Sequence, residues 1–212
     1  MSEMPRHYQA PYARMTSQEE VLRFARARAF ATIVAVEQDA PLIAHAPVIW
    51  VDGSFRFHLA RGNPVLSHAE AGGRLTLIFA GPDAYISPDW YESADMVPTW
   101  NYVRAIAAGR SRMLSREELR SQIDGLSAIQ EEALRPKAPW TSAKMTPARL
   151  EALLGGIGGV SVEAEEVTGI AKLSQNRTEA DRAGAIAGLR RRGDALSLAI
   201  AEAMERGGAI SS

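Results

Sequence analysis

Consecutive β-prone segments joined by tight turns are the feature that most constrains how this chain can fold. Strands are expected over residues 30–36, 42–51, 55–60 and 75–79, and Asp52-Gly53 between the second and third is a typical hairpin turn. These strands do not alternate regularly with helices, which argues against a doubly wound parallel sheet. The sequence therefore predicts a mainly β, α+β fold: an antiparallel barrel with helices at its periphery.

Later segments extend this pattern. A long strand is expected from the second half of the aromatic stretch at 84–102 through Tyr102 and Ile106 to Met113, and further strands are expected over residues 160–167 and 170–173. Glycine turns are expected at 81–82, at 155–159 and at Gly169, where a second hairpin would form, and Gly109 is expected to mark a bulge.

Helix starts are indicated by capping boxes and by Asn-Pro or Thr-Pro pairs. Helices are expected over residues 17–29, 63–72, 115–133, 146–154, 178–189 and 196–204. The last two follow the final strand. We therefore expect a barrel domain over residues 1–177 and a C-terminal helical appendage, residues 178–212, packed on the barrel.

Composition narrows the possible functions. The 212 residues carry a net charge of −1 and include no cysteine, so disulfides and thiolate metal sites are excluded and a cytoplasmic location is expected. The charge provides no overall attraction to nucleic acid or to a membrane surface. The four histidines show no metal-ligand spacing, so no metal is expected. No apolar run approaches the roughly 20 residues of a membrane span, and the polar start of the chain is unlike a signal peptide.

Residues 84–102, AYISPDWYESADMVPTWNY, concentrate aromatic side chains on either side of a short polar loop. One interpretation is that the rings cap an open end of the barrel, with their polar tips bonded. The other is a wall for a flat ligand, with Ser87 and Asn101 as hydrogen-bonding groups and Trp100 among the rings. The sequence leaves both open.

Two polar clusters could bind an anion. In HLARGNP, residues 58–64, Arg61 can hold a phosphate bidentately and Asn63 can cap the following helix. The alternative is a surface arginine beside an ordinary Asn-Pro cap. In KLSQNR, residues 172–177, two cations flank a hydroxyl and two amides directly after a strand, which suits a ligand rich in heteroatoms or an ordinary polar turn.

The motifs MPRHY, FATIV, LIAHAP, HLARGNP, GPDAYISPDWY, VPTWNY and KLSQNR occur in this order. Together they resemble the PaiB-like family of FMN-binding negative transcriptional regulators, over most of the chain. The resemblance implies a flavin-binding split barrel that forms homodimers, with FMN near the subunit interface. It also implies a flavin site built from His45, His58, Arg61, Asn63, Trp100, Asn101, Lys172, Gln175, Asn176 and Arg177.

The chain departs from the family pattern at several positions. Asp83 stands where the family tends to have histidine, and Arg104 and Ile106 replace histidines often found after WNY. Ala44 replaces a hydroxyl residue, and Ala171 replaces a tryptophan.

Three functions remain open on the sequence. The first is an FMN-binding regulator of the PaiB type, whose contact with DNA the net charge does not support; Arg190, Arg191 and Arg192 are its best candidate contacts. The second is a flavin-dependent oxidoreductase of unknown substrate. The third is a degenerate barrel without flavin. No catalytic residue is assigned, because no serine lies in a nucleophile motif and no general acid or base stands out.

Overall fold

The computed structural model describes residues 8–207, which form two compact units. His7 and most of the MPRHY motif therefore lie outside the described residues. The first unit comprises the chain up to Arg28, Ala80–Ala105 and the chain from Thr168 onward. The second comprises Ala29–Phe79 and Ile106–Val167. The domain boundary expected after residue 177 remains a prediction.

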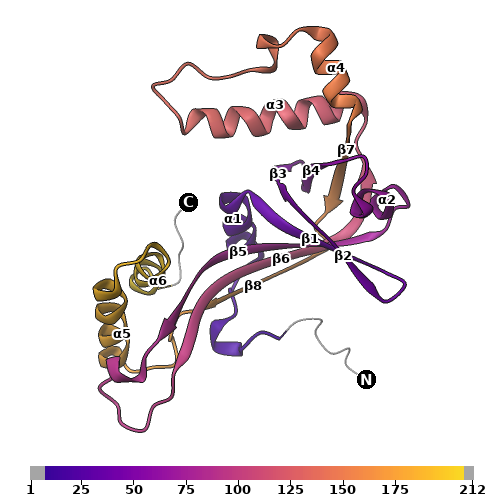
Figure 1. Ribbon diagram of the computed structural model, residues 1–212. Coiled ribbons are helices and arrows are strands. Elements are labelled where there is room, and N and C mark those ends of the chain that lie inside the picture. The colour runs from indigo at the N-terminus through magenta and orange to yellow at the C-terminus, as the bar shows by residue number, and fades with distance from the viewer. Residues whose placement is uncertain (1–7, 208–212) are drawn as a thin grey trace. The chain divides into compact units, whose positions relative to one another are not determined.

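Eight strands form one sheet in the order β2-β1-β5-β6-β7-β4-β3, and β8 pairs with β6 (Figure 1). The strands are β1 (Phe30–Glu37), β2 (Ala40–Pro47), β3 (Ile49–Val51), β4 (Ser54–Ala60), β5 (Arg74–Ile86), β6 (Thr99–Met113), β7 (Ile157–Glu163) and β8 (Glu166–Lys172). The pairs β1–β2, β1–β5, β3–β4, β4–β7 and β6–β7 all run antiparallel. The expected antiparallel α+β fold is therefore confirmed.

The described residues include six α-helices and three short 3₁₀ turns. The helices are α1 (Gln18–Arg28), α2 (Pro64–Glu70), α3 (Arg116–Glu132), α4 (Pro147–Gly155), α5 (Glu179–Arg192) and α6 (Ala195–Glu205). The turns are η1 (Pro11–Ala13), η2 (Pro88–Trp90) and η3 (Ser142–Lys144). Each α-helix overlaps a helix expected from the sequence.

The core of the second unit is built by strand alternation. Phe55, Phe57 and Leu59 of β4 are buried, while the residues between them are only partly buried. The Phe55 ring lies 5.0 Å from that of Phe79 and 4.6 Å from that of Trp50. This apolar layer fixes the direction of β4, and with it the side chains that β4 presents on its other face.

Local capping fixes the helices of the second unit. The Asn63 side chain accepts from the Val65 backbone N–H and starts α2. Ser115 and Glu118 form the expected capping box of α3. Leu119 of α3 is buried in a small cluster with residues of α4, so α3 and α4 hold each other through an apolar contact.

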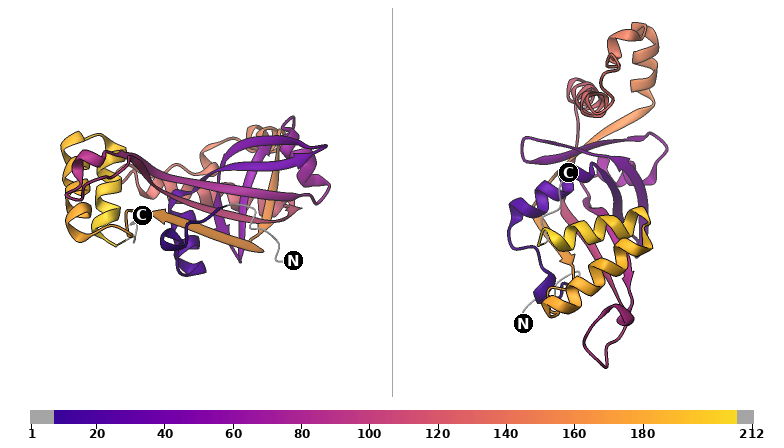
Figure 2. Two further views of the ribbon diagram at one scale, coloured as in Figure 1. Left: turned by 90° about the horizontal axis from the view of Figure 1, so that it is seen from below. Right: turned by 90° about the vertical axis from the view of Figure 1, so that its left-hand side faces the viewer.

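In the first unit, α5 and α6 pack side by side (Figure 2). Gly193 ends α5 in the left-handed conformation, with φ of 72°, and Asp194 caps α6. Trp90 of η2 lies against α5 at Gly188, where an added Cβ would come within 2.2 Å of the indole ring. The C-terminal helices are therefore held against the β5–β6 connection by close backbone approach.

Several glycines that predict turns lie inside strands instead, and the predictions at these positions are wrong. β5 continues through Gly81-Pro82, because Gly81 packs closely on Phe24. β7 includes Gly158 and Gly159, where the side chains of Leu66 and Leu114 leave no room for a Cβ.

The expected hairpin at Gly169 is also wrong. The connection falls between β7 and β8 at residues 164–165, and both strands pair with β6. Gly169 lies within β8, where an added Cβ would meet Met15 Sδ at 2.4 Å.

The strand expected over residues 42–51 is divided into β2 and β3, because the backbone N–H of Val48 donates to the Ala29 carbonyl oxygen, 2.9 Å away.

Candidate functional site

The residues expected to bind a cofactor form two groups, one in each compact unit. The second unit holds His45, His58, Arg61 and Asn63. The first unit holds Ser87, Trp100, Asn101, Lys172, Gln175, Asn176 and Arg177. Each group can be described from its own contacts.

Arg61 presents a guanidinium to water at the end of β4. Its Nε donates to the Gly155 carbonyl oxygen at 3.3 Å, and its Nη1 lies 3.7 Å from a Glu70 carboxylate oxygen. The side chain is 60% exposed, so this ion pair is long and largely hydrated. Such a pair contributes only about 0–1 kcal/mol, and an incoming anion can replace it.

The two histidines of the second unit make one hydrogen bond each. His58 projects from the face of β4 opposite to its buried phenylalanines, and its Nδ1 lies 3.2 Å from Gln122 Oε1 of α3. His45 is exposed on β2, with its Nδ1 3.2 Å from Thr32 Oγ1 on the neighbouring strand.

Lys172 and Arg177 bring two positive charges together in the first unit. Lys172 donates from Nζ to Thr99 Oγ1 at 2.6 Å, and its pKa is lowered first by burial and then by the charge of Arg177. Arg177 lies over the Tyr91 ring, 5.4 Å from its centroid. Neither cation forms an ion pair with any carboxylate among residues 8–207. Two close and uncompensated cations form a site for an anionic group.

The loop that carries these cations is shaped by its own polar side chains. Gln175 accepts from the Leu173 backbone N–H at 2.7 Å and donates to the Ala171 carbonyl oxygen. Asn101 is fully buried and donates to Ser174 Oγ at 3.0 Å. Asn176 lies in the exposed turn that follows. The buried Asn101 and the bonded Gln175 therefore hold the loop from which Lys172 and Arg177 project.

The aromatic stretch divides between packing and exposure. Trp90 packs on α5 and Tyr91 is 9% exposed, whereas Trp100 is 53% exposed and meets Tyr85 edge to face at 6.3 Å between centroids. Ser87 caps η2 by accepting from the Asp89 backbone N–H. The first two rings are packed as that interpretation expects, but the Tyr91 hydroxyl is buried without a hydrogen-bond partner among the described residues, while Trp100 retains an open surface.

Two further residues complete this region and escaped the sequence analysis of the site. Thr99 accepts the Lys172 hydrogen bond, and Asp181 of α5 is 1% exposed. One Asp181 oxygen accepts from the backbone N–H groups of Glu92 and Ser93, each at 2.9 Å, and the other accepts from Ser93 Oγ at 2.8 Å. These bonds lower the pKa of Asp181, the Ser93 N–H most of all. Asp181 thereby fixes the loop beside Tyr91.

Within residues 8–207, no His, Asp or Glu side chains gather in a group of three that could hold a metal ion. The same part of the chain contains no helix long and apolar enough to cross a bilayer.

Two of the solved structures with a similar fold are proteins that bind flavin and heme. The FAD and heme binding protein from Mycobacterium smegmatis superposes with a TM-score of 0.57 at 14% identity, over 76% of this chain and 73% of that one. The flavocytochrome Anf3 from Azotobacter vinelandii has a TM-score of 0.56 at 18% identity, over 84% of this chain and 79% of that one. Together with the antiparallel sheet, these similarities define the fold class as the flavin-binding split barrel.

The chain belongs to the family described as "Putative FMN-binding domain", whose pattern matches residues 7–166. The protease synthase and sporulation protein PAI 2 of Bacillus subtilis is 33% identical over 202 residues, 93% of this chain and 96% of that protein. Protein AN0679 of Emericella nidulans is 29% identical over 74% of this chain and 74% of that protein. The PaiB-like resemblance and FMN as the cofactor are therefore confirmed.

The residues present fit FMN. Its phosphate and the polar edge of its ring both accept hydrogen bonds, and each unit by itself presents cations that could meet such groups: Arg61 in the second, Lys172 and Arg177 in the first.

Proposed function

We propose that this protein is an FMN-binding flavoprotein whose cations recognise two different parts of the cofactor. Arg61 of one chain holds the phosphate, and Lys172 with Arg177, of the same chain or of its partner in a dimer, holds the polar edge of the isoalloxazine ring. The observation that carries the proposal is the Lys172–Arg177 pair, because two neighbouring cations without a carboxylate partner among the described residues are stabilised by an anionic ligand.

Exposure supports this division of roles. A phosphate dianion is strongly hydrated, and Arg61 meets water at a strand end with only a long ion pair to displace. Lys172 is partly desolvated, and Arg177 lies against the face of an aromatic ring. A flat ring with acceptor atoms along one edge suits that drier and partly aromatic surface.

Bound FMN supplies hydride and single-electron transfer. The residues of this chain bind and orient it. The charges of Lys172 and Arg177 favour negative charge at the ring edge. Thr99 positions Lys172 by a direct hydrogen bond, and Asn101 holds the loop between the two cations by its hydrogen bond to Ser174.

A comparison of FMN with riboflavin, which lacks the phosphate, tests the two roles. Arg61→Ala is expected to weaken FMN by about ten- to a hundredfold, because a charge-assisted bond contributes roughly 1.5–3 kcal/mol, and to leave riboflavin unchanged. Lys172→Met and Arg177→Met should weaken both flavins alike. If the Lys172 and Arg177 variants weaken FMN alone, these cations hold the phosphate instead. If no variant changes either affinity, the proposed site is wrong.

Homodimerisation is proposed on the outer face of the β1–β2 pair. Val34 lies opposite Ile43 on this face, and Val36 lies opposite Pro41. Ile43 is 55% exposed and Val36 63% exposed, which is unusual for neighbouring apolar side chains in a sheet. A second copy of the chain would cover this face in an isologous contact.

The relative from Bacillus subtilis is named for protease synthesis and sporulation. For this chain, we propose that any regulatory role acts without direct contact between the protein and DNA. Arg190 forms a bidentate pair with Glu205, and Arg192 pairs with Asp194 at 2.7 Å. The arginine run in the last turn of α5 is therefore largely neutralised by the protein itself.

A further inference from the structure

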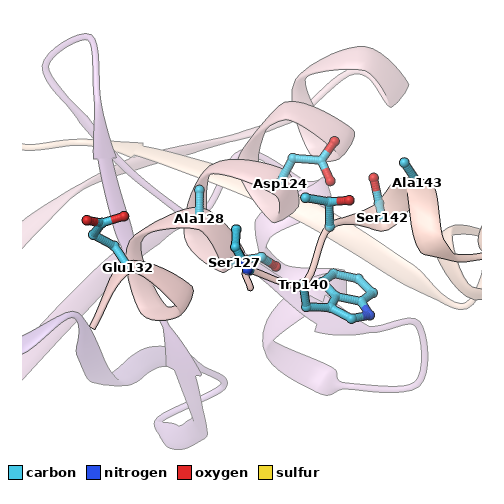
Figure 3. A pocket seen from close by; sticks show the side chains of 9 residues that line it. Asp124, Ser127, Ala128, Glu132, Trp140, Ser142 and Ala143 are labelled. Carbon is cyan, nitrogen blue, oxygen red and sulfur yellow. The ribbon is translucent and has the colours of Figure 1, made fainter. Parts of the chain in front are cut away.

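The second unit contains a cavity that none of the flavin residues lines. It lies between α3 and the segment that returns from α3 toward α4, and its volume is about 410 Å³ (Figure 3). Small-molecule sites span roughly 300–1,000 Å³, so the cavity is large enough for a compact organic ligand. The lining residues are Asp124, Ser127, Ala128, Glu132, Pro139, Trp140, Thr141, Ser142 and Ala143.

The lining favours positive charge. It includes the carboxylates of Asp124 and Glu132, whereas no Lys, Arg or His is among the lining residues that the structure describes. Glu132 is bound by Arg135 at 2.8 Å. Asp124 is only loosely paired, with Arg120 Nε 3.9 Å away on an exposed helix face. Asp124 is therefore the carboxylate that a ligand can engage.

Ser142 adds a second feature that indicates a ligand. Its residue is 7% exposed, yet its hydroxyl has no hydrogen-bond partner within residues 8–207, and it lines the cavity. The Ser142 oxygen is not among the fully buried unpartnered atoms, so the small exposed part of this residue includes its hydroxyl, which can bond a polar group that enters the cavity. In Figure 3, Ser142 lies at the same end of the cavity as Asp124 and Trp140, while Glu132 lies apart from them.

Trp140 provides an aromatic surface on a backbone whose position is fixed. Its backbone N–H donates to Glu131 Oε2 at 2.8 Å, and the same carboxylate oxygen accepts from Lys137. These bonds fix the backbone at Trp140 before any ligand arrives, which reduces the ordering cost of binding. An indole face beside a carboxylate is the arrangement that attracts an organic ammonium group.

We propose that this cavity binds a small organic cation, an ammonium group with an apolar body. The ammonium group contacts Asp124 and Ser142, and the apolar body packs on Trp140. This site is separate in composition from the flavin residues and does not depend on FMN.

Titration with 2-phenylethylammonium, followed by calorimetry on the FMN-loaded protein, tests the proposal. Its uncharged counterpart 2-phenylethanol serves as the matched ligand. We expect saturable binding of the ammonium compound, at least about tenfold tighter than binding of the alcohol, because a charge-assisted contact adds about 1.4 kcal/mol or more. Equal affinity for the two compounds, or no saturable binding of the ammonium compound, would overturn the proposal.

Variants locate the site. Asp124→Asn should weaken 2-phenylethylammonium by about three- to tenfold and 2-phenylethanol by less, because the alcohol carries no charge, and Ser142→Ala should also weaken 2-phenylethylammonium. Glu151→Gln is the matched control, because Glu151 is a carboxylate of the neighbouring helix α4 that pairs with Arg116 and does not line this cavity. Circular dichroism confirms folding of each variant. An affinity that Asp124→Asn leaves unchanged, or that Glu151→Gln lowers equally, contradicts the assignment.

Discussion

Arg104 of β6 donates from Nη2 to an oxygen of Asp83 of β5 at 2.6 Å. Arg104 also donates to the Gly81 carbonyl oxygen at 2.7 Å and lies 5.9 Å from the centroid of the Tyr102 ring. An ion pair therefore joins the two strands at this point in the first unit.

Removal of this ion pair should destabilise the protein modestly. Arg104→Ala is expected to lower the free energy of unfolding by about 1–2 kcal/mol, because it removes the pair, a backbone hydrogen bond and alkyl packing. Asp83→Ala should cost less, about 0.5–1 kcal/mol, since the pair is partly hydrated. Urea denaturation of both variants and of the double variant measures the coupling between them. Strictly additive losses would show that the two side chains do not interact.

Asp181 makes the stability of the first unit sensitive to acid. Its folded-state pKa lies below its usual value, so the stabilisation is present above the unfolded pKa of about 3.9 and is lost as pH falls through the folded pKa. Asp181→Asn should lower the urea midpoint at pH 7 and make it less dependent on pH below about 4. Asp89→Asn, at an exposed position in η2, is the control and should leave the midpoint unchanged. Parallel pH profiles for wild type and Asp181→Asn would contradict this role.

Assembly can be tested at the β1–β2 face. Light scattering should give about twice the chain mass of 23.0 kDa for the wild type. Ile43→Glu, a change at a position that is 55% exposed in the single chain, should shift the protein toward the monomer without unfolding it. A monomeric wild type would contradict the proposed dimer. A dimer that persists in Ile43→Glu would show that the interface lies on another face.

The paired arginines in the last turn of α5 predict weak interaction with nucleic acid. We expect no sequence-selective shift of promoter DNA by the purified protein at physiological salt, because Arg190 and Arg192 already have carboxylate partners and the net charge is −1. Electrophoretic mobility assays over a range of salt concentrations measure this. Tight and steeply salt-dependent binding would support direct regulation.

Local chemistry made much of the fold predictable. The Asp52-Gly53 hairpin has positive φ at both residues, and the Asn63 cap, the Ser115 capping box and the Gly193 helix end are all found where the sequence signals lie. Each of these signals acts over a few residues. They need no knowledge of what the segment packs against.

The glycines at 81, 158, 159 and 169 show where such reasoning fails. Glycine signals a turn and a close approach equally well, and here the close approach is to side chains far along the chain.

Prediction of the candidate site from the sequence is limited in the same way, because its contacts join residues that are far apart in the chain. The KLSQNR motif indicates two cations, but the contact of Lys172 with Thr99 spans 73 residues and has no local signature. Likewise, Asp181 can be identified as a helix-start residue, but not as the acceptor for Ser93.

The flavin itself offers the most direct test of the central claim. FMN should bind the purified protein with a stoichiometry approaching one per chain, with the absorbance of the ring perturbed relative to free FMN, and Lys172→Met/Arg177→Met should weaken it by about tenfold or more. The account predicts that riboflavin binding suffers the same loss in this double variant and none in Arg61→Ala. Failure of the wild-type protein to bind FMN at micromolar concentration would contradict the account.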